Sequence, residues 1–140
     1  MNNLKLHLNI LRENEQIEFE GIVFTNCAFI DFLIDDRNPF DNTKEKKGFI
    51  VWDELKKTTV NSGHYLILTC VCGIADDAGF DLIEVKRTDN SVSWKFMDES
   101  NWNWKFKKEN YDSEIEHLEK EIDNIENTLT LEPEYVIFPE

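Results

Sequence analysis

The sequence predicts an α+β domain: a mostly antiparallel, twisted β-sheet of about six to eight strands with one C-terminal amphipathic helix packed on it. Two observations predict this class. Several runs before residue 108 alternate apolar and polar side chains, the period of a half-buried strand. Residues 115–129 instead repeat apolar side chains every three or four positions, the period of a helix. With 140 residues we expect a single domain, 1–140, with a β-rich body at about 1–108 and an acidic helix and terminal strand at about 111–139.

The N-terminal runs predict a hairpin. Apolar and polar residues alternate over 4–10, and the alternation restarts over 17–24 after the break Glu13-Asn14-Glu15. Residues 27–34 form a more continuous apolar run, which fits either a strand buried on both faces or a short buried helix. Residues 35–47 are polar and contain a proline, so they carry the longest loop signal of the chain.

The middle of the chain predicts an antiparallel meander. Residues 49–55 fit a strand or the first turns of a short helix. Three strand-like runs then follow at 65–70, 80–85 and 92–96, separated by glycines and an Asp-Asn turn signal. Residues 102–106 alternate aromatic and polar side chains and add one more strand.

One amphipathic helix is expected near the C-terminus. Ser113 and Glu116 have the spacing of a capping box, which places the start of the helix at Ser113. Its apolar seam consists of Ile115, Leu118, Ile122, Ile125 and Leu129, and its other face carries Glu114, Glu116, Glu119, Glu121, Asp123 and Glu126. The seam spans only about two heptads, which favours packing across the sheet over a dimerisation zipper. Residues 135–138 are expected to add an edge strand.

The charge is strongly negative and unevenly placed. The chain carries −14, and residues 109–140 alone hold eleven acids against one lysine. Such a field attracts basic proteins and repels phosphate backbones, so we expect a basic protein partner and no direct nucleic-acid binding. Acidity that serves solubility alone is the alternative.

The sequence also bears on location and on the state of the cysteines. No apolar run approaches the ~18 residues of a membrane span. The first residues lack a basic start followed by an apolar block and a cleavage site. We therefore expect a cytoplasmic protein without membrane contact. The three cysteines form an odd set, which favours reduced thiols.

No residue pattern predicts catalysis or metal binding. Cys70 and Cys72 could supply two thiolates to zinc, but a structural site needs four ligands, and only Cys27 and His64 are plausible additions. Burial of both cysteines as small apolar residues is favoured. A His64–Cys70 dyad lacks any supporting motif. We expect no catalytic residue, no metal, no cofactor and no enzymatic activity; cryptic acidic catalysis is the alternative.

One hairpin carries a family resemblance, through Cys70, Cys72, Gly73, Ala78, Gly79 and Trp94. The string Cys-x-Cys-Gly, a short loop, Ala-Gly and a tryptophan-bearing strand resembles small bacterial proteins, some of which are immunity proteins of toxin systems. The chain departs from that pattern at Asp77, where a third cysteine is expected. The resemblance covers about a quarter of the chain and implies no catalytic residue.

These observations predict a bacterial immunity protein or antitoxin that binds a basic toxin domain, of nuclease type, and occludes its active surface. The alternative is a small scaffold or oligomerisation protein with no inhibitory role. We expect a monomer, with a dimer as the alternative. Turn chemistry alone also accounts for the paired aspartates. The candidate partner-binding residues are acids and one tryptophan: Asp35, Asp36, Asp76, Asp77, Glu119, Asp123, Glu126 and Trp102.

Overall fold

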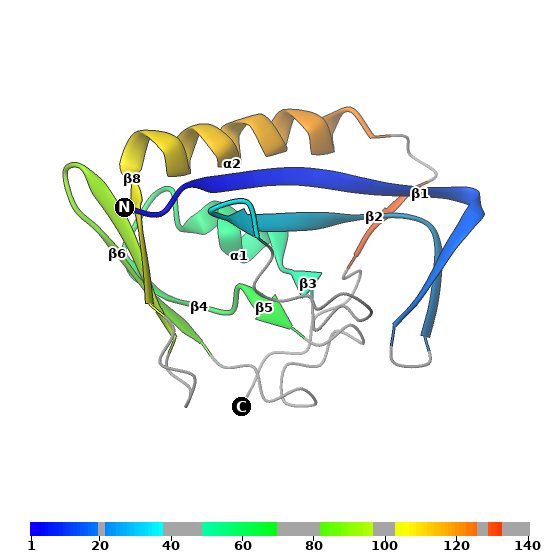
Figure 1. Ribbon diagram of the computed structural model, residues 1–140, viewed down its shortest axis with the longest axis horizontal. Helices are drawn as coiled ribbons and strands as arrows, with labels where there is room; N and C mark the ends of the chain where they lie inside the picture. Colours follow the sequence, from blue (N-terminus) through cyan, green and yellow to red (C-terminus); the bar gives the residue numbers. More distant parts are fainter. Residues whose placement is uncertain (20–21, 38–48, 70–81, 97–102, 126–128, 133–140) are drawn as a thin grey trace.

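The computed structural model describes residues 1–19, 22–37, 49–69, 82–96, 103–125 and 129–132 and confirms the α+β class (Figure 1). The strands of these segments form a three-stranded sheet, a four-stranded sheet and a two-stranded pair. The sheet orders are β1-β2-β9, β4-β6-β7-β8 and β3-β5. The strands are β1 (Leu4–Phe19), β2 (Ile22–Ile34), β3 (Phe49–Ile50), β4 (Gly63–Tyr65), β5 (Leu68–Thr69), β6 (Ile83–Arg87), β7 (Ser91–Phe96), β8 (Asn103–Lys107) and β9 (Thr130–Leu131), and the helices are α1 (Trp52–Lys57) and α2 (Lys108–Asp123).

The N-terminal hairpin is confirmed, but its predicted turn is in the wrong place. β1 and β2 pair antiparallel, with Leu4 opposite Ile34 at one end and Phe19 opposite Ile22 at the other. Residues 4–10 therefore pair with residues 28–34, not with residues 17–24. The run at 27–34 is accordingly a strand, not a helix.

The polar stretch Glu13-Asn14-Glu15 is an irregularity inside β1, because the register shifts between Leu11 and Gln16. The Thr25 hydroxyl donates to the Glu15 carbonyl oxygen at 2.6 Å and so holds the irregular segment against β2. A bulge of this kind looks like a turn in the sequence, since both interrupt the alternation with polar residues.

The meander is confirmed over β4, β6, β7 and β8, which pair antiparallel in that order. The predicted strand at 65–70 is divided, however. β4 ends at Tyr65 within the meander, whereas β5 pairs with β3 in a separate ribbon. Leu66 and Ile67, between the two strands, are fully buried, which explains why the whole run is apolar.

Helix α2 lies along β1 (Figure 1) and begins five residues before the predicted cap. Ser113 lies inside the helix, and the N-cap residue Lys107 makes no side-chain capping bond. The capping-box prediction is therefore wrong. β8 runs directly into α2, and the Lys108 N–H donates to the Asn90 carbonyl oxygen of the preceding turn at 3.1 Å. A tertiary contact thus satisfies a backbone donor at the observed start of the helix, where the sequence has no capping side chain.

Packing of α2 on the sheets is confirmed. Ile115 and Leu118 are buried in the main core, and Ile122 packs against it. Leu129 is buried beyond the helix end, next to β9, which pairs parallel with β2. The edge strand expected at 135–138 lies outside the described residues.

Trp94 lies at the centre of the core. Its ring stacks on Phe32 with a centroid distance of 4.8 Å, and its indole N–H donates to the Tyr111 hydroxyl at 3.1 Å. The Thr58 hydroxyl donates to the Leu55 carbonyl oxygen, so it accepts the Tyr111 proton, and the side-chain donors of Trp94, Tyr111 and Thr58 each have an acceptor. The network joins α1, β7 and α2 through satisfied polar groups.

Candidate protein-binding surface

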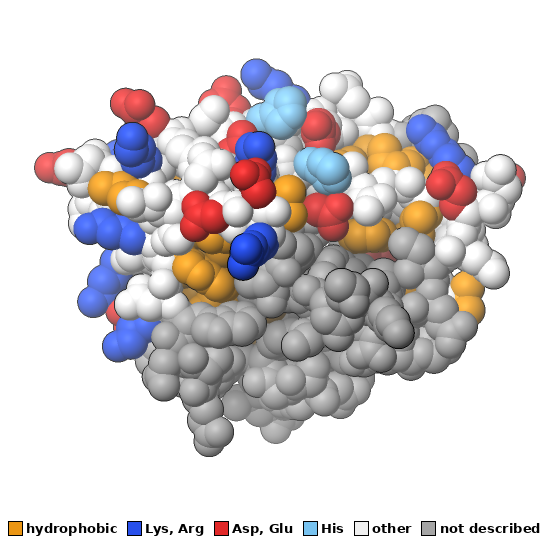
Figure 2. All heavy atoms as spheres, in the orientation of Figure 1, with side chains coloured by type: hydrophobic (Ala, Val, Ile, Leu, Met, Phe, Trp, Pro, Cys, Tyr) orange, Lys and Arg blue, Asp and Glu red, His pale blue; other side chains and the backbone are white. Residues whose placement is uncertain are grey.

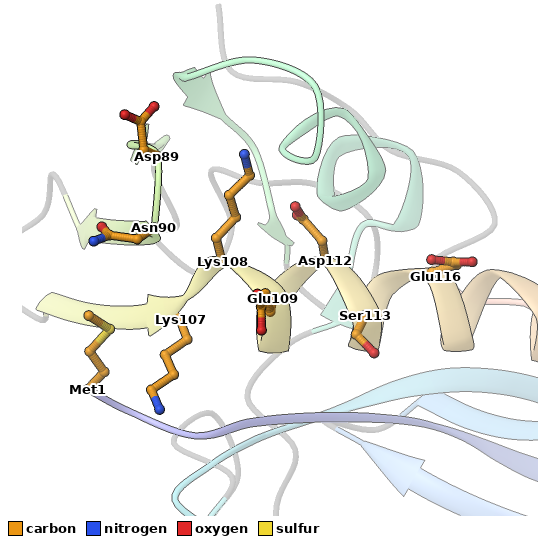
Figure 3. A pocket seen from close by; sticks show the side chains of 9 residues that line it. All are labelled: Met1, Asp89, Asn90, Lys107, Lys108, Glu109, Asp112, Ser113 and Glu116. Carbon is orange, nitrogen blue, oxygen red and sulfur yellow. The ribbon is translucent and has the colours of Figure 1, made fainter.

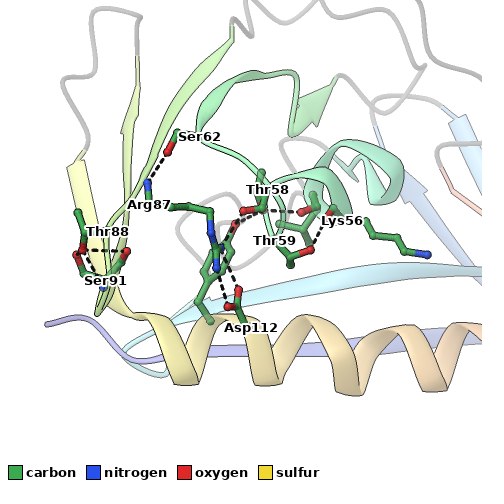
Figure 4. A network of polar contacts seen from close by, with 10 residues as sticks. Lys56, Thr58, Thr59, Ser62, Arg87, Thr88, Ser91 and Asp112 are labelled. Atoms are coloured by element: carbon green, nitrogen blue, oxygen red, sulfur yellow. Dashed lines mark hydrogen bonds and ion pairs between the residues drawn. The ribbon is translucent and has the colours of Figure 1, made fainter.

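Arg87 forms hydrogen bonds with both the end of α1 and helix α2, and so links the two helices (Figure 4). Its guanidinium makes two bonds to the Asp112 carboxylate, at 3.0 and 2.7 Å, and donates to the Thr58 carbonyl oxygen at 2.9 Å. The side chain of Arg87 is only 12% exposed. A bidentate pair of this kind fixes orientation as well as distance. Asp112 is therefore one acid of α2 that serves the fold.

Other side chains of α2 cover the open edge of β1. The N–H groups of Leu4, Leu6 and Leu8 point away from β2 and donate to side-chain oxygens of the helix. Their acceptors are Asn110 at 2.9 Å, Glu114 at 2.9 Å and Glu121 at 3.2 Å, and the Asn110 amide also donates back to the Leu4 carbonyl oxygen at 3.0 Å. An uncovered strand edge is a site for unwanted pairing, and here the helix blocks it.

The first part of this match follows from two regular spacings. Alternate N–H groups of a strand are about 6.6–6.8 Å apart. Four residues of an α-helix rise about 6.0 Å, so Asn110 and Glu114 nearly match the step from Leu4 to Leu6, whereas Glu121 lies seven residues beyond Glu114 and does not follow this spacing. Glu114 and Glu121 were expected on the solvent face of the helix. That assignment is wrong, because both carboxylates face β1.

Asp35 and Asp36, two candidate partner-binding residues, form the turn after β2. Their φ angles are 52° and 68°, and Ile34 and Arg37 exchange backbone hydrogen bonds on either side of them. Two central residues with positive φ are typical of a type I′ turn, in which aspartate is favoured. The turn-chemistry interpretation of this pair is thus supported.

Both carboxylates of this turn also contact β1 or the residues before it. Asp35 accepts from the Asn3 N–H at 2.8 Å and from the Asn2 amide at 2.9 Å. The Asn3 bond is the main cause that lowers the pKa of Asp35. Asp36 is exposed and lies 3.2 Å from the Lys5 ammonium. These two acids therefore have intramolecular partners.

Of the six other candidate partner-binding residues, two lie in the described residues and four do not. Glu119 pairs with Lys56 of α1 at 2.7 Å, and this bond raises the pKa of Lys56. Asp123 is exposed at the end of α2 and has no ion-pair partner among the described residues. Asp76, Asp77, Glu126 and Trp102 lie outside the described residues. The structure thus brings Glu119 and Asp123 to the same end of α2 and places Asp35 and Asp36 in a separate turn.

The outer face of the four-stranded sheet is basic, which the sequence reasoning missed. Its outward positions include four exposed lysines, Lys86, Lys95, Lys105 and Lys107. The acid of this face, Glu84, lies 3.2 Å from Lys86 and 3.5 Å from His64. Lysine side chains gather over this sheet at the left of Figure 2, whereas acids, lysines and histidines mix over α2. β6 and β7 contribute one of these lysines each and β8 contributes two, so only the pairing of these strands brings them together.

A shallow hollow of about 760 Å³ lies at the start of α2 (Figure 3). Lys107 and Lys108 line it together with four acids, Asp89, Glu109, Asp112 and Glu116. Charges of both signs are interleaved, and Asp112 is already bound to Arg87. The hollow therefore does not select one class of ligand.

The described residues contain no cluster of three or more histidine, cysteine or acidic side chains arranged to hold a metal ion. Cys27 is buried, and burial raises the pKa of its thiol to about 11, while Cys70 and Cys72 lie outside the described residues. In the part of the chain that the structure describes, no helix has the length and apolar character needed to cross a bilayer.

Comparisons of the chain with protein-family models, with curated proteins and with solved structures find no match.

Proposed function

We propose that the protein is a bacterial immunity protein or antitoxin, which binds a basic toxin domain, of nuclease type, and occludes its active surface. The observation that supports this proposal is the separation of charge. Among the described residues the outer sheet face holds four lysines and one glutamate, a net of +3, whereas the other described residues together carry −9. The described surface outside the basic sheet face is therefore more negative than the described residues taken together.

Helix α2 carries both acids that have contacts within the fold and acids that have none among the described residues. Asp112, Glu114 and Glu121 are bound to groups of the fold. Glu109 and Asp123 are exposed at the two ends of the helix and have no ion-pair partner among the described residues. A helix of 16 residues spans about 24 Å, enough to lie across a substrate cleft.

The mechanism that follows is occlusion with electrostatic capture. Carboxylates on the acidic side would occupy the cationic cleft in which a nuclease holds phosphates, and the opposed charges would speed association. The basic sheet face would point away from such a partner, because like charges at a contact are costly.

The test begins with the toxin gene expected beside the gene for this protein. The purified toxin domain is mixed with the protein, and the association rate is measured at low salt and at about 0.1 M salt, where exposed charges are screened beyond ~10 Å. A steep fall in rate with salt is expected. A cognate toxin that is not bound would refute the proposal, and a rate indifferent to salt would refute the electrostatic mechanism.

A matched pair of variants locates the contact. Asp123→Lys and Asp89→Lys make the same change in charge at exposed positions, one at the end of α2 and one in the turn between β6 and β7. Asp123→Lys is expected to slow association and Asp89→Lys to have a smaller effect. Equal effects would mean that only net charge matters and that α2 is not the contact surface.

A further inference from the structure

None of the residues that the structure describes covers the edge of β1 beyond the end of α2. The helix accepts from Leu4, Leu6 and Leu8, and its last residue is Asp123, whereas β1 continues to Phe19. By the same alternation the next outward-facing residue is Ile10. No described residue outside the hairpin accepts from its N–H. Ile10 therefore presents one backbone donor and one backbone acceptor at an open strand edge.

An apolar groove of about 390 Å³ lies beside this edge. Leu8 and Ile10 of β1 form one wall, and Ile125 and Leu129, beyond the end of α2, form the other. Ile10 and Ile125 are half-buried, so the groove is open to solvent at these positions. Its volume suits one or two apolar side chains, not a folded element.

The polar rim of the groove favours a cation. Glu121 lines it, with one carboxylate oxygen accepting from the Leu8 N–H and the other 3.1 Å from His117, and the last turn of α2, the negative end of the helix dipole, lies next to it. Arg12 is the basic residue at the rim, and exposed Glu13 and Glu15 follow it in β1. The lining itself holds one acid and one base, so the excess of negative charge that favours a basic occupant comes from Glu13 and Glu15, which follow Arg12 in β1.

We propose that this groove binds an extended, basic segment of the protein partner, which adds a short strand to the edge of β1 at Ile10. An extended backbone offers the acceptor and donor that Ile10 needs, and alternate side chains enter the groove or reach its acidic rim. The choice of partner rests on the proposed function, since the charge of the rim matches a basic toxin. The groove then provides specificity, while the exposed acids of α2 provide attraction.

The direct test uses a peptide probe. A blocked seven-residue peptide of alternating lysine and valine is titrated into the isotope-labelled protein, and amide shifts are followed by NMR. Saturable shifts at Leu8, Ile10 and the residues around Ile125 are expected, with a Kd of about 1 mM or tighter. A peptide with glutamine in place of lysine is expected to bind more weakly. Absence of saturation up to about 5 mM, or shifts centred on the sheet face, would overturn the proposal.

Two kinds of variant separate the backbone contact from the charge. Ile10→Pro removes the outward N–H but no bond of the hairpin, and proline is tolerated on strand edges. It is expected to weaken the lysine peptide by about threefold to tenfold, as for one lost hydrogen bond. Glu121→Gln keeps an oxygen for the Leu8 N–H and is expected to weaken only the lysine peptide. Unchanged binding by both variants would overturn the proposal.

A second pair of variants tests the groove even if Ile10→Pro unfolds the hairpin. Ile125→Arg places a charge on the groove wall without touching β1, and Val60→Arg makes the same change at a residue that is 72% exposed elsewhere. Only Ile125→Arg is expected to abolish peptide binding. If it abolishes peptide binding yet leaves toxin association unchanged, the inference about the partner fails and the proposed function stands. If the unaltered protein binds no toxin, the proposed function fails, and the peptide titration still decides what the groove accepts.

Discussion

Truncation of Glu114 tests whether helix α2 stabilises the molecule by covering the edge of β1. Glu114→Ala removes the acceptor of the Leu6 N–H, a bond of 2.9 Å to a residue that is only 3% exposed. A hydrogen bond to a charged group contributes roughly 1.5–3 kcal/mol. Glu114 is only half-buried, so water can replace part of that bond, and alanine is the better helix former. The expected loss in free energy of unfolding is therefore about 1–2 kcal/mol.

The assay is guanidinium denaturation with amide hydrogen exchange as a second readout. The midpoint should fall without a change in slope, because the surface exposed on unfolding is nearly the same. Exchange at Leu6 should accelerate more than exchange at His7, whose N–H points towards β2. Glu114→Gln keeps an acceptor oxygen and should cost less than about 1 kcal/mol.

Glu116→Ala is the matched control. Glu116 lies on the same helix, is exposed, and has Lys120 at 3.9 Å as its ion-pair partner. Its removal should change stability by no more than about 0.5 kcal/mol. If Glu114→Ala and Glu116→Ala destabilise equally, or if Glu114→Gln costs as much as the alanine variant, the edge-covering role is wrong.

Two other outcomes follow from burial. Leu118→Ala, at a fully buried helix position, should lower the free energy of unfolding by about 2–5 kcal/mol in a monomer; a cost near zero by denaturation would mean that the seam does not pack on the core. Burial, with a smaller contribution from Glu132, raises the pKa of the Cys27 thiol from 9.0 to about 11, so the folded chain keeps a proton that the unfolded chain loses between these values. Stability should therefore fall as pH rises from 9.0 to about 11, and Cys27→Ala should lack this component in denaturation curves recorded on both sides of that window; identical pH dependence would contradict the assignment.

The N-terminal hairpin was predicted from the sequence, but the position of its turn was not. Alternation over 4–10 identified β1 as a strand, because one face of it is buried there, whereas residues 27–30 of β2 are all buried and do not alternate, so periodicity left strand and helix open for that run. It could not separate a bulge at residues 13–15 from a turn, since both interrupt the pattern with polar residues. The tertiary pairing across Thr25 decided between them.

For the candidate surface, too, one part was predictable from the sequence and another part was not. The acidity of the C-terminal quarter was evident from composition, but the role of each acid was not. The sequence places Glu114 and Glu119 on the same polar face of the helix. In the structure Glu114 accepts a hydrogen bond from the Leu6 N–H of β1, whereas Glu119 forms an ion pair with Lys56. The type I′ turn at Asp35-Asp36 agrees with the local preference of aspartate, so the sequence interpretation needed no tertiary information there.

By itself, the sequence determined the fold class, the helix seam at Ile115 and Leu118, and the excess of negative charge, because these depend on local period and on composition. Only the tertiary structure decided which acids are free and where the lysines gather. Lys86, Lys95 and Lys105 come from three strands, and strand pairing brings them to one face. The net charge is a sum over the sequence and does not depend on the fold. The electrostatic field that a partner meets does depend on it, because it is set by distances between residues far apart in sequence.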